Sequence, residues 1–250
     1  MYSKEKTMRR TLQLSIIVPV YNESNRLGNV YNIAEYLKKL KIKSELIVVN
    51  DGSNDKTLKM LNDISNKIKF KIISYDKNKG KGFAVKTGML SANGKYRLFT
   101  DIDLSVPIEE CGRFIDFMKL HPVVIGSRKK GSSRIILHQP KMRELMGSFF
   151  TLLSQKTLGL EISDFTCGFK CFSEEAARNI FNKVRIDRWG FDSEIIFVSH
   201  KLGYKIFEIP VAWSHDPSTK VKFPQDVFSS LIELILIRFY NFVGAYNRSI

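Results

Sequence analysis

Cysteine is scarce in this sequence, and the few cysteines exclude two common kinds of structural support. The 250 residues include three of them, Cys111, Cys167 and Cys171. Three cysteines form no disulfide framework, and the C-G-F-K-C spacing lacks the second Cys or His pair that a zinc site requires. We therefore expect reduced thiols, in or near the core of a cytosolic protein.

Long apolar runs are also missing. No stretch approaches the roughly 18 uncharged apolar residues that a membrane-spanning helix needs. The first residues are basic and then apolar, but the apolar run is short and has no small-residue cleavage site. It continues directly into a strand-and-turn pattern. The sequence therefore predicts neither a signal peptide nor a spanning helix.

The two familiar phosphate-binding loops are absent as well. Residues 78–88 read NKGKGFAVKTG, which matches neither G-x-x-x-x-G-K-[ST] nor G-x-G-x-x-G, so an ATPase and a Rossmann dehydrogenase are disfavoured. The segment still resembles a phosphate cradle. Gly80 and Gly82 permit close backbone approach, and Lys79 or Lys81 could face an anion. A flexible turn with solvated lysines explains the same residues equally well.

Acidic residues are outnumbered, 25 against 40 basic ones, which gives a formal net charge of +15. Such an excess favours anionic partners, among them nucleic acid, nucleotides and acidic membrane surfaces, without choosing between them. A solvated, lysine-rich surface would account for it too. The basic residues are spread out, with no aromatic-interleaved strip and no helix-turn-helix pattern. We therefore do not expect a nucleic-acid partner.

Strands and helices alternate through the first half of the chain. Apolar and β-branched runs predict strands at 14–18, 45–49, 71–74, 95–100 and 123–125, and the segments between them have helical apolar spacing. This alternation indicates βαβ units. We therefore predict an α/β fold with a mainly parallel central sheet flanked by helices.

The alternation of predicted strands and helices ends after residue 126. A basic segment precedes a long helix predicted at 141–158. A Gly/Cys loop, two helices, a strand at 205–211 and an apolar closing helix at 227–246 then follow. No repeat, low-complexity tract or Pro/Gly linker divides the chain, so residues 1–250 are predicted to form a single domain.

Two carboxylates follow the strand predicted at 95–100, in the stretch RLFTDIDLSVP. If the strand continues to residue 103, its period of two places Asp101 and Asp103 on one side. Neighbouring carboxylates repel, and a divalent cation relieves that repulsion. Oxygen ligands suit Mg²⁺ or Mn²⁺, which usually bind a substrate's phosphates as well. A solvated turn is the simpler alternative for so short a motif.

Several motifs in a fixed order make the chain resemble a known family. The first half contains SIIVPVYNESNRL, ELIVVNDGSNDKT, NKGKGFAVKTGM, TDIDLSVP and VIGSR, as in the family-two glycosyltransferases with the GT-A fold. The second half contains RELMGSFFTLLSQKTLGLEISDFTCGFKCF, RWGFDSEI and EIPVAWSHDPSTKV. These resemble the dolichyl-phosphate glucosyltransferase branch, beside the dolichyl-phosphate mannose synthases. The likeness covers residues 12–240.

The resemblance implies that two parts of the chain bind different substrates. Residues 12–127 would bind the nucleotide sugar, and residues 128–226 would form the acceptor side. Within the first part, Pro19, Tyr21 and Glu23 would line the nucleotide pocket. The whole set expected to contact the donor is Pro19, Tyr21, Glu23, Asp51, Lys81, Gly82, Asp101, Ile102, Asp103, Arg128 and Lys220.

The roles within this set also follow from the resemblance. Asp51 would hydrogen-bond the base or ribose, and a metal held by Asp101 and Asp103 would bridge the diphosphate. Lys220 would belong to a mobile loop that closes over the site. The mannose synthases often carry a glutamine where this chain has Ser105, and serine there is common in the glucosyl branch, which favours glucose and UDP.

The implied chemistry is metal-dependent, inverting transfer of a hexose to a polyprenyl phosphate. The residues expected to take part are Asp103, Arg128, Arg143 and Asp192. Arg128 and Arg143 would form a cationic pair near the phosphates, because the planar guanidinium binds phosphate bidentately. A phosphate acceptor is largely dianionic at neutral pH and needs no base.

A hydroxyl acceptor, in contrast, would need a general base. Asp192, Glu194 and Asp164 are the candidates, and purely structural roles explain them as well. The four histidines are scattered, and none is assigned to catalysis.

The preferred reaction uses UDP-glucose and dolichyl or another polyprenyl phosphate, with Mg²⁺ or Mn²⁺. The alternatives are a GDP-mannose-dependent mannose synthase and a transferase acting on the hydroxyl of a soluble glycan. A lipid acceptor predicts peripheral contact with the cytoplasmic face of a membrane. The 227–246 helix could lie in that membrane's interface, pack as core or serve a homodimer.

Overall fold

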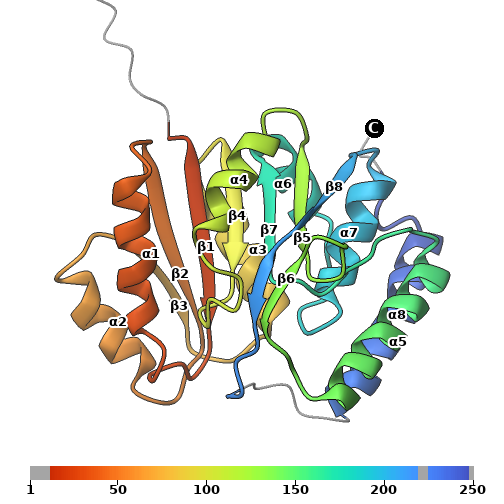
Figure 1. Cartoon of the computed structure of the whole chain (residues 1–250), viewed down its shortest axis with the longest axis horizontal. Helices are drawn as coiled ribbons and strands as arrows, with labels where there is room; N and C mark the ends of the chain where they lie inside the picture. Colours follow the sequence, from red (N-terminus) through yellow and green to blue (C-terminus); the bar gives the residue numbers. More distant parts are fainter. Residues whose placement is uncertain (1–11, 219–224, 248–250) are drawn as a thin grey trace, which may run out of the picture.

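The computed structural model describes residues 12–218 and 225–247. A seven-stranded sheet runs through its centre in the order β3-β2-β1-β4-β7-β5-β8 (Figure 1). Its strands are β1 (Leu14–Val20), β2 (Ser44–Asp51), β3 (Lys71–Tyr75), β4 (Tyr96–Thr100), β5 (Val123–Ser127), β7 (Phe169–Ser173) and β8 (Ile206–Pro210). Every pairing is parallel except those of β7, which runs antiparallel to both β4 and β5. The predicted α/β fold with a mainly parallel sheet is confirmed.

Helices cover both faces of this sheet, and the sheet separates two hydrophobic clusters. The helices are α1 (Gly28–Lys39), α2 (Thr57–Ser65), α3 (Lys81–Ser91), α4 (Glu110–Phe117), α5 (Lys141–Leu158), α6 (Glu174–Phe181), α7 (Phe191–Lys201) and α8 (Gln225–Phe242). In β1, Ile16 and Val18 pack with α1 and α4, whereas Ile17 between them packs with α3. Alternate side chains of a strand point to opposite faces, so a strand covered on both sides is apolar throughout.

Two parts of the second half differ from the sequence prediction. Residues 169–173 were predicted to lie in a loop, but they form β7, in the middle of the sheet. The misleading residue is Lys170, a lysine in a fully buried strand, which is tolerated because Asp192 pairs with it. A short second sheet was also missed. It pairs β6 (Arg134–Leu137) with β9 (Ala212–Ser214) in parallel.

The remaining elements agree with the prediction to within a few residues. The long helix occupies 141–158 as predicted, whereas the closing helix, predicted at 227–246, spans Gln225–Phe242. All three cysteines are buried free thiols, as expected. Among the helices of the described ranges, none combines the length and the hydropathy needed to cross a bilayer.

Candidate active site

The carboxyl ends of the parallel strands bring most of the predicted residues to one edge of the sheet. Asp51 ends β2, Asp101 directly follows β4, and Arg128 directly follows β5. In open α/β sheets, ligands bind at this edge. The topology therefore gathers residues that are far apart in the sequence.

Asp51 organises the glycine- and lysine-rich loop that leads into α3. Its buried carboxylate accepts hydrogen bonds from Asn78 Nδ2 at 2.8 Å, from the Lys79 amide at 2.8 Å and from the Gly80 amide at 3.0 Å. Burial, together with the nearby charge of Asp51, raises the pKa of Tyr75. The carboxylate thus holds the loop in place, while its predicted contact with the base or ribose stays a prediction.

The two glycines of this loop have a packing role that the sequence did not reveal. A Cβ on Gly80, whose φ is +111°, would lie 2.3 Å from the Asp187 carbonyl oxygen. A Cβ on Gly82 would lie 2.5 Å from the Ile186 carbonyl oxygen. Glycine is therefore required because the start of α3 contacts residues 186–187. Contact of Gly82 with a phosphate stays a prediction.

The paired carboxylates lie beside a lysine. Lys81 Nζ forms an ion pair with Asp101 Oδ1 at 2.6 Å, and Asp103 Oδ1 accepts a hydrogen bond from the Ser105 amide at 2.9 Å. Burial and, after it, the charge of Asp101 raise the pKa of Asp103. Negative charge is therefore concentrated here, with Lys81 as its nearest cation.

This pair of carboxylates fits a divalent cation that needs few protein ligands. Within residues 12–218 and 225–247, no group of three or more His, Cys, Asp or Glu side chains forms a metal cage. Mg²⁺ and Mn²⁺ prefer hard oxygen ligands, and Mg²⁺ typically binds one or two carboxylates plus water and substrate phosphates. Asp101 and Asp103 supply the kind and number of ligands that such a cation uses.

β4 ends at Thr100 and residues 102–103 form a turn, so the strand does not continue to residue 103 as the same-side argument required. Two further contacts fix this turn. The Ile102 side chain is buried, and its carbonyl oxygen accepts a hydrogen bond from Asn29 Nδ2 at 2.8 Å. A Cβ on Gly168 would lie 2.1 Å from Asp101 Oδ2, so the glycine of the C-G-F-K-C segment makes room for the carboxylate. Sequence reasoning weighed that segment as a zinc motif and as part of the family resemblance, and it missed this role.

Arg128 is held rigidly by an acid that sequence reasoning had considered as a base. Its Nε and Nη2 donate to the two oxygens of Asp164, at 2.7 and 2.8 Å, and its guanidinium lies 5.5 Å from the centre of the Trp213 ring. Burial alone raises the pKa of Asp164, but the charge of Arg128 and its side-chain and backbone hydrogen bonds together outweigh burial and lower the pKa to about 2. Asp164 is therefore a poor base and a strong anchor.

Asp192 lies in the same charged network. Its carboxylate pairs with the fully buried ammonium of Lys170, which also donates to the Cys167 carbonyl oxygen at 2.7 Å. Burial raises the pKa of Asp192, while the charges of Lys170 and then Lys81 act in the opposite direction. The sequence offered no signal for Lys170 beyond its charge within an apolar run.

Glu194 has a structural role. It is fully buried and accepts hydrogen bonds from the Arg185 amide at 2.9 Å, the Ile186 amide at 2.8 Å and the Tyr246 hydroxyl at 2.5 Å. These contacts anchor the segment that packs against Gly80 and Gly82. The structural alternative that the sequence left open for Glu194 therefore describes its contacts.

The structure describes four more of the predicted residues. Pro19 lies within β1, and Tyr21 follows it with an exposed side chain. Glu23 pairs with Arg26 at 2.9 Å. Arg143 lies in the first turn of α5. Lys220 lies outside the described residues.

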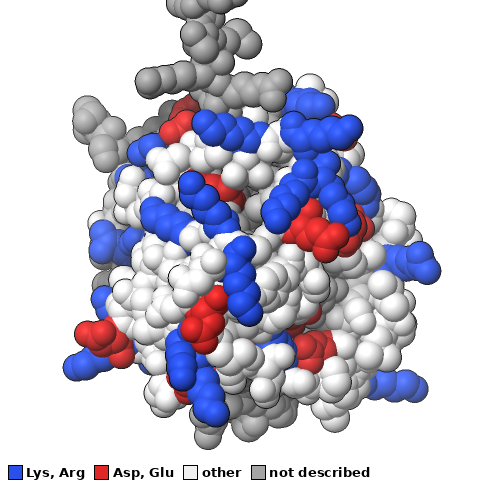
Figure 2. Space-filling view, turned by 90° about the vertical axis from the view of Figure 1, so that its left-hand side faces the viewer, with Lys and Arg blue, Asp and Glu red and all other residues white. Residues whose placement is uncertain are grey.

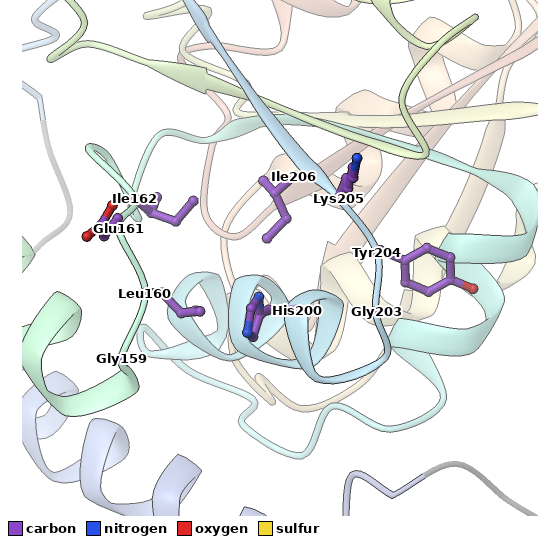
Figure 3. Close-up of a pocket in the computed structure, with 9 residues that line it drawn as sticks. All are labelled: Gly159, Leu160, Glu161, Ile162, His200, Gly203, Tyr204, Lys205 and Ile206. Carbon is purple, nitrogen blue, oxygen red and sulfur yellow. The ribbon is translucent and has the colours of Figure 1, made fainter.

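A separate pocket of about 380 Å³ lies elsewhere (Figure 3). It is lined by the end of α5, the end of α7 and the start of β8, including Glu161, His200 and Lys205. β8 starts at the edge of the sheet opposite to the one that carries Asp101 and Asp103. This pocket therefore does not belong to the candidate active site.

Solved structures share this architecture and define its class. Glucosyl-3-phosphoglycerate synthase from Mycobacterium tuberculosis, crystallised with Mn²⁺, uridine diphosphate and glucosyl-3-phosphoglycerate, superposes with a TM-score of 0.66. The alignment covers 91% of this chain and 79% of that one, at 16% identity. Residues 1–349 of TarS from S. aureus, in complex with UDP-GlcNAc, superpose with a TM-score of 0.59 at 18% identity, over 92% and 67% of the chains. The fold is thus that of the GT-A glycosyltransferases.

Sequence comparison identifies the family. The model of glycosyl transferase family 2 matches residues 15–181, and the chain belongs to that family. The protein is therefore a glycosyltransferase, as the sequence motifs predicted.

The relatives include proteins named dolichyl-phosphate beta-glucosyltransferase. One from Dictyostelium discoideum is 34% identical over 94% of this chain and 77% of its own length. One from Drosophila melanogaster is 32% identical over 84% of this chain and 70% of its own length. One from Homo sapiens is 31% identical over 95% and 78%. The resemblance to this branch, predicted from the sequence, is confirmed.

Proposed function

We propose that this glycosyltransferase moves glucose from UDP-glucose to a polyprenyl phosphate, with inversion at the anomeric carbon. The observation that carries the proposal is the edge of the sheet where Asp101 and Asp103 follow β4 and Arg128 follows β5, with β7 between the two strands. The names of the relatives support glucose and dolichyl phosphate. UDP in two structures of the same fold supports the choice of nucleotide.

Asp101 and Asp103 would hold Mg²⁺ or Mn²⁺. When bound, the cation supplies positive charge to the diphosphate of the donor. Arg128 would add a fixed charge near the same phosphates, because Asp164 and Trp213 limit its movement. Lys81, Gly82, Tyr21 and the other predicted donor contacts belong to this proposal, as does Lys220.

The contacts of the three acidic residues considered as bases favour an acceptor that carries its own negative charge. Asp164 is paired with Arg128, Asp192 is paired with Lys170, and Glu194 accepts hydrogen bonds from two amides and a hydroxyl. The low pKa of Asp164 makes it a weak base, whereas burial raises the pKa of Asp192 and of Glu194. Those two carboxylates are instead engaged by Lys170 and by the donors to Glu194. A phosphate monoester is largely dianionic at neutral pH and attacks without losing a proton.

The transfer balances without a proton. One oxygen of the acceptor phosphate forms a bond to the glucose C1, while the bond from C1 to the donor's β-phosphate oxygen breaks. The bond electrons leave with the nucleoside diphosphate, whose charge Arg128 stabilises. Arg143, in the first turn of α5, would face the acceptor phosphate.

A lipid-borne acceptor also means that the protein must reach a membrane. We include peripheral contact with the cytoplasmic face of a membrane in the proposal. GDP-mannose as donor and a glycan hydroxyl as acceptor are the competing reactions, and a homodimer is the competing assembly.

The test measures release of nucleoside diphosphate from UDP-glucose and, separately, from GDP-mannose. Each reaction contains Mn²⁺ or Mg²⁺ and a short polyprenyl phosphate in detergent. We expect release from UDP-glucose that depends on both lipid and metal, and a loss of about 100-fold or more in Asp103→Asn. Release that ignores the lipid, or that prefers GDP-mannose, would contradict the proposal.

A further inference from the structure

Exposed apolar side chains are concentrated on one part of this molecule. Of the fifteen large apolar side chains that are exposed in the described residues, twelve lie on β6, on α5, or on α8 and the residue after it. Monomeric soluble proteins rarely expose contiguous apolar patches of this kind. This grouping of exposed apolar side chains therefore indicates that a partner covers them.

On α5 the exposed residues form a stripe. Met142, Leu145, Phe149 and Leu152 recur at spacings of three and four, so they lie on one face of the helix. The opposite face packs inward through residues such as Leu153 and Leu158. The helix is thus apolar on two faces, only one of which the fold covers.

On α8 the pattern is the same. Ile232, Ile235 and Phe239 are exposed at helical spacing, whereas Leu234 and Ile237 are buried in the core. The two helices contact each other and lie together at one side of the molecule (Figure 1). We call their exposed residues, with Ile136 and Leu137 of β6, the α5/α8 apolar surface.

Charge decides between a bilayer and a second copy of the chain. Residues 128–158, which carry β6 and α5, include seven Lys or Arg and one acidic residue, Glu144. Arg128 pairs with Asp164, but five of the other basic residues are exposed, and two copies meeting through this surface would bring them together: Lys129, Lys130, Arg134, Lys141 and Lys156. An anionic lipid surface would instead attract them, and an amphipathic helix with basic residues at its border is the usual interfacial element.

The surface is also connected to the candidate active site. Lys129, next to Arg128, donates from Nζ to the Gly147 carbonyl oxygen at 2.9 Å and to Thr151 Oγ1 at 2.5 Å, both on α5. Trp213, against which Arg128 lies, belongs to β9, and β9 pairs with β6. A bilayer in contact with this surface would therefore lie beside the phosphate-binding arginine.

We propose that the α5/α8 apolar surface lies on an anionic bilayer, with its apolar side chains at the headgroup–acyl boundary. This inference deepens the proposed function and rests on it for the identity of the acceptor. Membrane binding itself is measured without any substrate, so the two can fail separately.

The experiment is sedimentation of the full chain with vesicles of phosphatidylcholine alone or mixed equally with phosphatidylserine. Wild type should bind the mixed vesicles. Phe149→Glu and Ile235→Glu should each bind about tenfold or more weakly, because each replaces a membrane-buried apolar group with a charge. Leu120→Glu is the matched control. Among the described residues, Leu120 is the most exposed leucine outside the surface, and it follows α4. The Leu120→Glu variant should bind vesicles as wild type does.

Two additional readouts keep the result interpretable. Circular dichroism must show that the variants are folded, and turnover of a short polyprenyl phosphate without vesicles should be unchanged in them. Wild type that ignores anionic vesicles, or surface variants that bind as wild type does, would overturn the inference. A concentration-dependent dimer that Phe149→Glu abolishes would assign the surface to a second copy. Vesicle binding without turnover would contradict the proposed function alone.

Discussion

At the scale of single residues, the candidate site is a chain of alternating charges. Lys170 pairs with Asp192, and the charges of Asp192 and Asp101 both act on Lys81, which pairs with Asp101. The sequence identified three of these four charged residues. The role of Lys170 was not predicted because its partner Asp192 is 22 residues away, and only the fold brings the two together.

The Lys81–Asp101 ion pair leads to a prediction about metal binding. A cation at Asp101 must compete with the Lys81 ammonium, so Lys81→Met should raise the affinity for Mn²⁺ several-fold in the absence of nucleotide. The measurement is titration of free Mn²⁺ by electron paramagnetic resonance. Lys79→Met, which removes a neighbouring lysine without this ion pair, is the control. Unchanged or weaker binding in Lys81→Met would show that the lysine does not compete.

The Arg128–Asp164 ion pair leads to a prediction about pH. The pKa of Asp164 is lowered to about 2 in the fold, so its contribution to stability is complete above its unfolded pKa of about 4 and is lost as pH falls toward 2. Asp164→Asn cannot titrate and leaves Arg128 without its buried partner. It should be less stable than wild type by about 3–5 kcal/mol at neutral pH.

The measurement is urea unfolding of wild type and Asp164→Asn at a series of pH values. The difference between the two proteins should shrink below about pH 4. A difference that stays constant down to about pH 2 would contradict the assigned ion pair.

At the scale of helices and strands, the apolar pattern of the sequence predicted the elements whose formation depends mainly on residues nearby in the chain. The strands covered on both faces and the 141–158 helix were recognisable from apolar periodicity, which depends on neighbours along the chain. β7, β6 and β9 were missed because their pairing partners are distant in sequence. The closing helix was ambiguous for a physical reason, since α8 has one apolar face in the core and another outside it.

The contact between α3 and residues 186–187 gives a prediction at this scale. Gly82→Ala places a Cβ 2.5 Å from the Ile186 carbonyl oxygen and 2.7 Å from Phe191 Cβ, so it should destabilise the protein by about 1–3 kcal/mol. Gly147→Ala is the control, because a Cβ there meets nothing within 4 Å and alanine favours a helix. Thermal unfolding compares the two. Equal stability of both variants would contradict the close packing at Gly82.

At the scale of the whole molecule, the net charge of +15 is unevenly distributed. On the face that carries α1 and α2, Lys and Arg alternate with Asp and Glu and with uncharged residues (Figure 2). The segment from Arg128 to Leu158 is more one-sided, and it borders the α5/α8 apolar surface. Net charge alone could not distinguish these regions, because it carries no information about which charges the fold places together.

The measurement that tests the central claim most directly compares two acceptors that differ in one group. One is a short polyprenyl phosphate, and the other is the same polyprenol without the phosphate. With UDP-glucose and Mn²⁺, the account predicts transfer to the phosphate and none to the alcohol, because the acids of the site are held by Arg128, Lys170 and backbone amides. Comparable transfer to the alcohol would contradict it, since a hydroxyl acceptor needs a base that these contacts do not leave available.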